Sequence, residues 1–290
     1  MTDSPLVISA TPTPFNPGGS LDLEGTRRMF AHLADSEVHS LFVAGTTGEF
    51  PALSDEERLA IIRAALVAVG PDRVIAHVGA ASAYQAARLA RAARLAGATM
   101  LAAITPYYVS ASLSAVRAYY AAVCAEAGGL PVYAYLIPRN TGTEISPAEL
   151  ADLIAEIGLA GAKLSIPGTE FLAEVSRLAP AGSRLYSGND SLIREVAEAG
   201  GHGVVSGVSP ACPGFFTDLA KAIGAGDAEA IARHQRLVDA AVAAIGPSAA
   251  HLKAALVEQG VLASAYCRMA LDPPDDVYRA RITAAWQGSP

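Results

Sequence analysis

The sequence predicts an α/β protein, a (β/α)8 TIM barrel followed by a small C-terminal helical domain. Short apolar runs alternate eight times with longer amphipathic stretches, and eight such units indicate a closed barrel rather than an open sheet. The runs are apolar at nearly every residue, as in parallel strands covered on both faces. A barrel of this kind takes roughly 250 residues. The chain has 290, which leaves room for a small appendage.

The apolar runs give the bounds of the eight expected strands. They are Leu6–Ala10, Ser40–Ala44, Val74–Val78, Met100–Ile104, Val132–Leu136, Gly161–Leu164, Arg184–Ser187 and Gly203–Ser206. A doubly wound sheet usually carries a Gly-rich phosphate loop after its first strand. Here the residues from Ala10 to Pro14 read ATPTP, which favours the barrel.

Helix start signals occupy the stretches between the strands. Ser54 with Glu57, and Ser146 with Glu149, have the spacing of capping boxes. Pro147 stands at a first helical position, where its missing N–H costs nothing. After about residue 222 the strand pattern ends, and we expect a barrel of residues 1–222 and a three-helix layer of residues 223–290. The three helices of that layer are predicted over Asp227–Ile245, Ala249–Gln259 and Pro274–Trp286.

Composition and charge exclude several classes of function. A net charge of −7 argues against nucleic-acid or anionic-membrane partners. No signal peptide is visible from Met1 to Pro5, and no apolar run is long enough for a membrane span, so a cytoplasmic protein is expected. The three cysteines and six histidines lack metal-ligand spacing, so we expect reduced thiols and no metal site, with His77 and His202 in structural roles.

Lysine is the most informative basic residue, because only three of the 21 basic side chains are lysines. Lys221 and Lys253 lie in helical stretches, where a solvated surface position is expected. Lys163 lies in an apolar run at the end of the sixth expected strand. Burial would lower the pKa of its amine and allow the amine to attack a carbonyl carbon. Alternatively, this lysine reaches out to solvent from the strand end.

Two further polar groups follow expected strands at the same end of the barrel, where active sites of this fold lie. Residues Gly45 to Glu49 read GTTGE after the second strand, and Tyr135 lies at the end of the fifth, one residue before its last, Leu136. Backbone N–H groups beside glycines, together with threonine hydroxyls, suit a carboxylate such as that of a 2-oxo acid. An ordinary turn leading into a helix would have the same sequence.

The chain resembles the family of dihydrodipicolinate synthase, N-acetylneuraminate lyase and the 2-keto-3-deoxy-sugar-acid aldolases. The resemblance covers essentially the whole chain, including the C-terminal helices. It rests on four motifs in order, namely Gly45-Thr46-Thr47-Gly48-Glu49, Thr105-Pro106-Tyr107-Tyr108, Tyr135-Leu136-Ile137-Pro138 and Gly161-Ala162-Lys163.

The resemblance implies a role for each matching position. Lys163 would form an imine with a 2-oxo acid, and Tyr135 would move protons to and from it. Thr46 would link Tyr135 to Tyr108, which such enzymes insert into a neighbouring subunit. The remaining matches would bind or line the oxo-acid site, and they are Thr47, Gly48, Gly188 and Val205. A homotetramer built as a dimer of dimers is implied, and imine chemistry needs no metal or other cofactor.

One departure from the family pattern bears on the substrate. The synthase motif reads Tyr-Asn-x-Pro-x-Arg, and its arginine binds the aldehyde's carboxylate. Here Asn140 stands in the arginine's place, Arg139 lies one residue earlier, and Leu136 replaces the usual asparagine. An amide cannot replace a bidentate guanidinium. The sequence therefore favours a pyruvate aldolase of the 2-keto-3-deoxy-sugar-acid type. The alternatives are 4-hydroxy-tetrahydrodipicolinate synthase and a non-catalytic 2-oxo-acid-binding protein.

Overall fold

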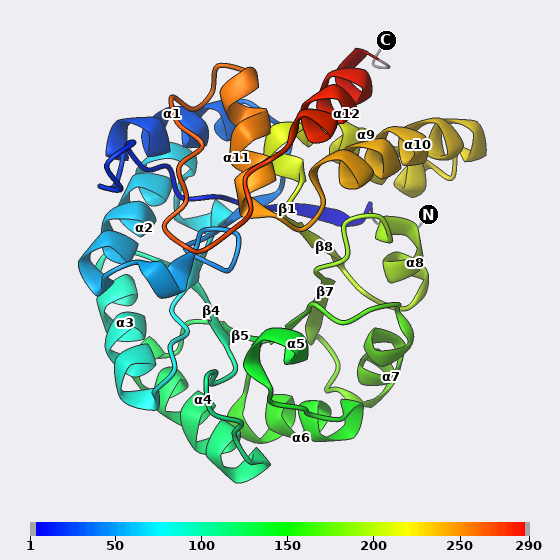
Figure 1. Cartoon of the computed structure of the whole chain (residues 1–290). Helices are drawn as coiled ribbons and strands as arrows, with labels where there is room; N and C mark the ends of the chain where they lie inside the picture. The colour runs from blue at the N-terminus through cyan, green and yellow to red at the C-terminus, as the bar shows by residue number, and fades with distance from the viewer. Residues whose placement is uncertain (1–3, 288–290) are drawn as a thin grey trace.

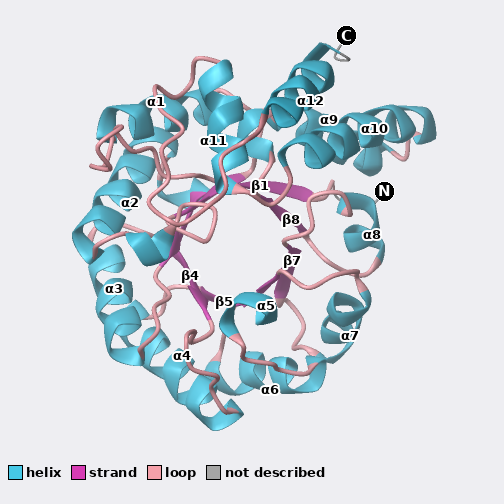
Figure 2. Ribbon diagram, viewed as in Figure 1, coloured by secondary structure: helices cyan, strands magenta, loops and turns pink. Residues whose placement is uncertain are grey.

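The computed structural model describes residues 4–287. Eight parallel strands form a closed barrel in sequence order, from β1 to β8, and β8 returns to pair with β1. The helices surround this ring, as Figures 1 and 2 show in a view along the barrel. The predicted fold is therefore confirmed. Residues 1–3 and 288–290 lie outside the described residues. They include part of the N-terminal stretch in which no signal peptide is visible, the first residues of the predicted barrel domain and the last residues of the predicted C-terminal layer.

The strands agree with the sequence prediction to within one residue. They are β1 Leu6–Ala10, β2 Ser40–Val43, β3 Val74–His77, β4 Met100–Ile104, β5 Val132–Leu136, β6 Gly161–Leu164, β7 Arg184–Ser187 and β8 Gly203–Ser206. The prediction that the second strand includes Ala44 was wrong, because Ala44 has a left-handed φ of 53° and leaves the extended ladder. The third strand likewise ends one residue early, at His77.

Helices follow the strands around the barrel. They are α1 Leu23–Ala34, α2 Asp55–Val69, α3 Ala83–Leu95, α4 Leu113–Ala127, α5 Pro138–Thr141, α6 Pro147–Ile157, α7 Glu170–Leu178, α8 Ile193–Glu198, α9 Pro213–Ala225, α10 Ala228–Ile245, α11 Ala249–Glu258 and α12 Asp276–Gln287. Both predicted capping boxes are present, at Ser54 with Glu57 and at Ser146 with Glu149. Each box satisfies backbone N–H groups that a helix start would otherwise leave without partners.

Residues that alternate along each strand divide the core into two layers. Outward side chains such as Val43, Ala76 and Ala134 pack under the helices. Inward side chains such as Phe42, Ile104 and Tyr135 fill the barrel. Both faces of the strands are thus buried, which explains why the runs are apolar at almost every residue.

The C-terminal helices α10, α11 and α12 match the three predicted helices to within two residues at each end. They lie together on one side of the ring, near β1 and β8 (Figure 1). The predicted domain boundary at residue 222 falls inside α9, and the division into two domains stays a prediction. Among the described residues, no single helix is long and apolar enough to cross a membrane. Only α10 and α11 taken together, with a bend of 110° between them, meet the requirements of length and composition.

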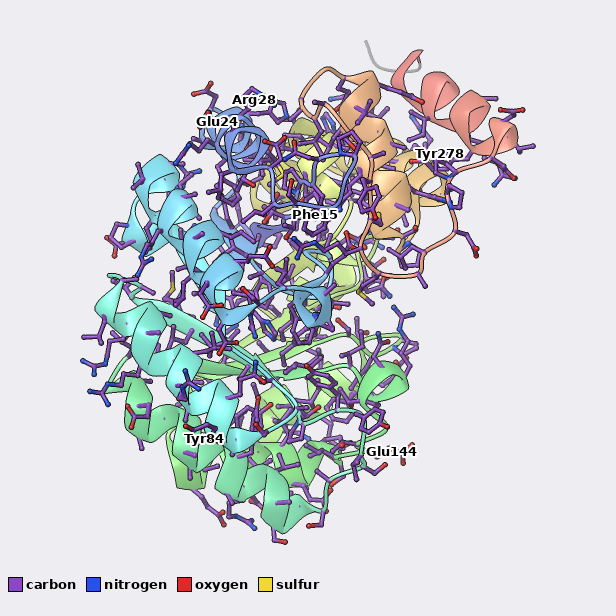
Figure 3. All side chains as sticks on the ribbon, turned by 60° about the vertical axis from the view of Figure 1, so that its left-hand side comes forward. Phe15, Glu24, Arg28, Tyr84, Glu144 and Tyr278 are labelled. Atoms are coloured by element: carbon purple, nitrogen blue, oxygen red, sulfur yellow. The ribbon has the colours of Figure 1, made fainter. Side chains whose placement is uncertain are left out.

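The surface position predicted for Lys253 was wrong. Its side chain is 0% exposed and forms an ion pair with Glu49, which is equally buried. The ammonium also donates to the Tyr266 carbonyl and lies 4.4 Å from the centre of the Phe15 ring. Phe15 lies between α1 and the C-terminal helices (Figure 3). Lys221, in contrast, is on the surface as predicted, in an exposed ion pair with Glu37.

We predict that Lys253→Met will lower the free energy of unfolding by about 3–5 kcal/mol, because it leaves the Glu49 carboxylate buried without its cation. Denaturant titration measures this loss. Lys221→Met is the matched control, since it removes a lysine from an exposed pair, and such pairs contribute little. Equal effects of the two substitutions would show that the buried pair does not hold the C-terminal layer.

Candidate active site

The barrel register places the two principal candidate residues side by side. Tyr135 on β5 pairs directly with Lys163 on β6, and both side chains point into the barrel. Lys163 is 6% exposed, so the reading in which it reaches out to solvent was wrong. Its Nζ lies 4.2 Å from the centre of the Tyr135 ring and 4.5 Å from that of Phe42. The electron-rich faces of two rings thus flank the amino group.

Thr46 joins this pair from the loop after β2. Its Oγ1 lies 3.1 Å from the Tyr135 hydroxyl. Burial alone would raise the pKa of Tyr135. The charge of Lys163 and hydrogen bonds from Thr46, Ser165 and Lys163 together outweigh burial, so the pKa lies below the ordinary value of 10. The arrangement therefore suits proton transfer at the Tyr135 oxygen.

The Gly45–Gly48 loop lies between two residues with left-handed backbones. Ala44 has φ 53° and Glu49 has φ 56°, a conformation that costs about 1–2 kcal/mol for residues with a Cβ. Glu49 is held by Lys253 and by the backbone N–H groups of Arg268 and Met269, at 2.8 Å each. The C-terminal segment thus fixes the conformation of a loop at the barrel mouth.

A pocket of about 210 Å³ opens at Lys163. Most of the site residues predicted from the sequence line it, namely Lys163, Tyr135, Thr46, Thr47, Gly188, Val205, Arg139 and Asn140. Gly48 does not. Its carbonyl accepts a hydrogen bond of 2.7 Å from the Thr13 hydroxyl. Arg139 and Asn140 belong to the short helix α5, directly after the β5 strand that carries Tyr135.

Tyr108 is the predicted site residue that lies outside the pocket. Its side chain is 95% exposed and its backbone is left-handed, with φ 77°. The preceding Tyr107 packs instead on the Phe50 ring of the same chain, with ring centres 5.4 Å apart. Tyr108 therefore makes no contact with the site of its own chain.

Asp190 lines the pocket and was not predicted from the sequence. Its carboxylate accepts a hydrogen bond of 3.3 Å from the Val208 N–H. Burial raises the pKa of this carboxyl above 3.8, although Ser206, Val208 and Lys163 act in the opposite direction. The rule that active-site residues follow strand ends could have found it, since it stands three residues after β7.

The C-terminal segment supplies one wall of the pocket through Met269 and Leu271. The same two side chains line a second cavity of about 470 Å³ behind that wall. On another side, Arg139, Ser165, Gly188 and Asp190 are shared with an adjoining groove of about 300 Å³. The pocket at Lys163 thus shares lining residues with a cavity and with a groove beside it. Across residues 4–287, no group of three or more His, Cys, Asp or Glu side chains has the arrangement of a metal site.

Comparisons with known proteins bear on the family and the fold. The sequence pattern of the dihydrodipicolinate synthetase family matches residues 4–287. The chain is similar to a 4-hydroxy-tetrahydrodipicolinate synthase of Methylococcus capsulatus, at 36% identity over 78% of this chain and 79% of the relative. Among solved structures it is similar to YagE of E. coli K12 in complex with pyruvate, with a TM-score of 0.90, 26% identity and coverage of 98% and 97%. A variant of the 2-keto-3-deoxygluconate aldolase of Sulfolobus solfataricus gives a TM-score of 0.87 at 28% identity, with coverage of 98% and 96%.

We predict that Thr46→Val will raise the pKa of Tyr135. The threonine hydroxyl donates to the phenolate form, and its loss removes one of the interactions that lower this pKa. Ultraviolet titration of tyrosinate measures the change, with Tyr135→Phe identifying which step belongs to Tyr135. An unshifted step in Thr46→Val would contradict the assigned hydrogen bond.

Proposed function

This chain belongs to the dihydrodipicolinate synthetase family and is a pyruvate-dependent lyase of the Schiff-base type, and from that premise we propose that Lys163 carries the imine and that the substrate is a hydroxylated 2-oxo acid longer than pyruvate. Cleavage would yield pyruvate and an aldehyde, and the reverse reaction would join them. The proposed activity is that of a 2-keto-3-deoxy-sugar-acid aldolase.

The reaction begins when the neutral Lys163 amine attacks the C2 carbonyl of the oxo acid. Tyr135 donates a proton to the departing hydroxyl, and loss of water leaves a protonated imine. The Tyr135 phenolate then accepts the proton of the C4 hydroxyl as the C3–C4 bond breaks, which releases the aldehyde and leaves an enamine. Tyr135 returns that proton to C3 of the enamine, and hydrolysis of the resulting imine releases pyruvate and restores Lys163 and Tyr135. General acid–base assistance of this kind contributes about 10²–10⁴-fold to the rate.

The other site residues have supporting roles in this proposal. Thr46 holds the Tyr135 hydroxyl, while Thr47 binds the substrate carboxylate through its hydroxyl and backbone N–H. Gly188 and Val205 line the oxo-acid end. The outward direction of Tyr108 supports its insertion into a neighbouring copy, and so a homotetramer arranged as a dimer of dimers.

The observation that carries the substrate proposal is that Asp190 and Asn140 both line the pocket. A carboxylate repels an aldehyde that bears its own carboxylate, but it accepts hydrogen bonds from hydroxyl groups. Asn140 offers amide hydrogen bonds without a positive charge. The adjoining groove of about 300 Å³ supplies room for a polyhydroxylated chain.

One observation favours a second candidate, 4-hydroxy-tetrahydrodipicolinate synthase. Arg139 also lines the pocket and the groove, so a guanidinium is present one position before the place where the synthase motif has it. The relative from Methylococcus capsulatus carries the synthase name. A chain that binds a 2-oxo acid without turnover is the remaining alternative, and a turnover assay distinguishes it.

We predict that borohydride will trap pyruvate on Lys163 alone. Lys163 is a buried amine that opens on the pocket, whereas Lys253 is bound to Glu49 and Lys221 lies on the surface. Intact mass followed by peptide mapping locates the adduct. Lys163→Ala should abolish it and Lys221→Ala should preserve it. An adduct on Lys221 or Lys253 would refute the imine assignment.

We predict that aspartate semialdehyde is a poor substrate and that Asn140→Arg improves its specificity constant by one to two powers of ten. A charge-assisted bond to a carboxylate contributes about 1.5–3 kcal/mol. The assay compares kcat/KM for synthesis with aspartate semialdehyde and for cleavage of 2-keto-3-deoxy sugar acids. Arg139→Ala is the companion variant. If the wild type is an efficient synthase and Arg139→Ala abolishes that activity, the protein is a synthase and the aldolase hypothesis is wrong.

A further inference from the structure

His77 is a buried group for which the proposed reaction has no use. It lies at the end of β3, pointing into the barrel, and is 0% exposed. Its ring packs between Phe42, Phe50 and Tyr135, with ring centres 4.6–6.1 Å apart. It thus touches the aromatic rings beside Lys163 without lining the pocket.

The two ring nitrogens of His77 contact the backbone of two different strand ends. Nδ1 lies 2.9 Å from the carbonyl oxygen of Ala44, and Nε2 lies 3.2 Å from the backbone nitrogen of Ile104. Ala44 follows β2 and leads into the Gly45–Gly48 loop. Ile104 ends β4 and pairs with Tyr135. One side chain therefore bridges the loop that carries Thr46 and the strand end beside Tyr135.

These contacts fix the tautomer of His77. The Ile104 N–H can only donate, so Nε2 must be the acceptor and cannot carry a proton. The proton then belongs to Nδ1, which donates to the Ala44 carbonyl. Arg58 Nη2 lies 3.2 Å from Nδ1 and donates to the His77 carbonyl at 2.7 Å. It cannot also donate to Nδ1, because that nitrogen carries the proton, so the Ala44 carbonyl is the partner of Nδ1.

The surroundings keep this ring neutral. Burial lowers the pKa of His77 well below its usual range, and the charges of Arg58 and Lys163 lower it further, against the opposing effect of the Ala44 carbonyl. Arg58 itself is buried, donates to the Gly79 carbonyl at 2.9 Å and lies over the Phe50 ring. A neutral ring with one donor and one acceptor satisfies both backbone groups at once.

We propose that His77 is a positioning residue, whose Nδ1–H holds the carbonyl of left-handed Ala44 and thereby keeps Thr46 within reach of the Tyr135 hydroxyl. Glu49 fixes the far end of the loop through Lys253, and His77 fixes the near end. The proposal rests on the imine reaction assigned to Lys163, and it concerns the proton transfer rather than the formation of the imine.

The test compares two substitutions of His77. His77→Asn keeps a donor close to the place of Nδ1 and should retain turnover within about threefold. His77→Phe keeps the ring but has no donor, and should lower kcat by about 10–100-fold, since a shift of a catalytic group by about 1 Å costs up to about a hundredfold. Thr217→Val is the matched control for a lost buried hydrogen bond, because its hydroxyl donates to the Gly214 carbonyl beside Leu6, at the opposite end of the barrel from the pocket. It should leave kcat unchanged.

Two further combinations separate positioning from general stability. In a Thr46→Val background, His77→Phe should lower kcat by less than threefold, because the group that it positions is already gone. Ala44→Gly should recover part of the activity of His77→Phe, since glycine adopts the left-handed backbone without help. Losses that multiply in the double variant, equal losses in the Asn and Phe variants, or an unchanged kcat in His77→Phe would each overturn the proposal.

Borohydride trapping keeps this result separate from the proposed function. Wild type, His77→Phe and His77→Asn should all form the pyruvate adduct on Lys163. If the wild type forms no adduct, the imine reaction itself is wrong. If the wild type traps pyruvate and the His77 variants behave against the pattern above, only the positioning role fails. Should His77→Phe not fold, His77→Asn and the double variant with Ala44→Gly still decide the question.

Discussion

The buried contact between Glu49 and Lys253 is the constraint on which the candidate site depends. It links two parts of the chain that no strand pairing connects, the loop after β2 and helix α11. Because both groups are fully buried, neither charge can turn to solvent as an alternative. The carboxylate also binds two backbone N–H groups of the C-terminal segment, so the loop conformation and the pocket wall are fixed by a single side chain.

The barrel fixes the positions of the two site residues that the contact between Glu49 and Lys253 does not reach. Parallel pairing puts Tyr135 and Lys163 on adjacent strands at the same height, and the alternation of side chains turns both inward. Their position follows from backbone register, which is rigid. The position of Thr46 follows from a loop, which needs contacts at both ends to be rigid. The site thus combines a group fixed by the sheet with a group fixed by side chains from elsewhere in the chain.

The sequence could predict what depends on local pattern. Apolar runs gave the strands, capping boxes gave helix starts, and strand-end positions pointed to Lys163, Tyr135 and Thr46. Lys253 could not be predicted, because a lysine in a helical stretch usually lies on the surface and its partner lies 204 residues away. Ala44 could not either, since alanine rarely takes a left-handed backbone. Asp190 follows two residues, Gly188 and Asn189, that also occur in ordinary turns.

The distance between Glu49 and Lys253 along the chain has a consequence for how the protein is made. The barrel strands are complete at Ser206, so the ring can close while the C-terminal helices are still being synthesised. Before Lys253 is synthesised, the Glu49 carboxylate has no cation to pair with in the interior, so it stays hydrated. The loop therefore cannot take its final form before helix α11 is available. Closure of the barrel alone does not complete the site, because the loop that carries Thr46 needs this contact from the C-terminal segment.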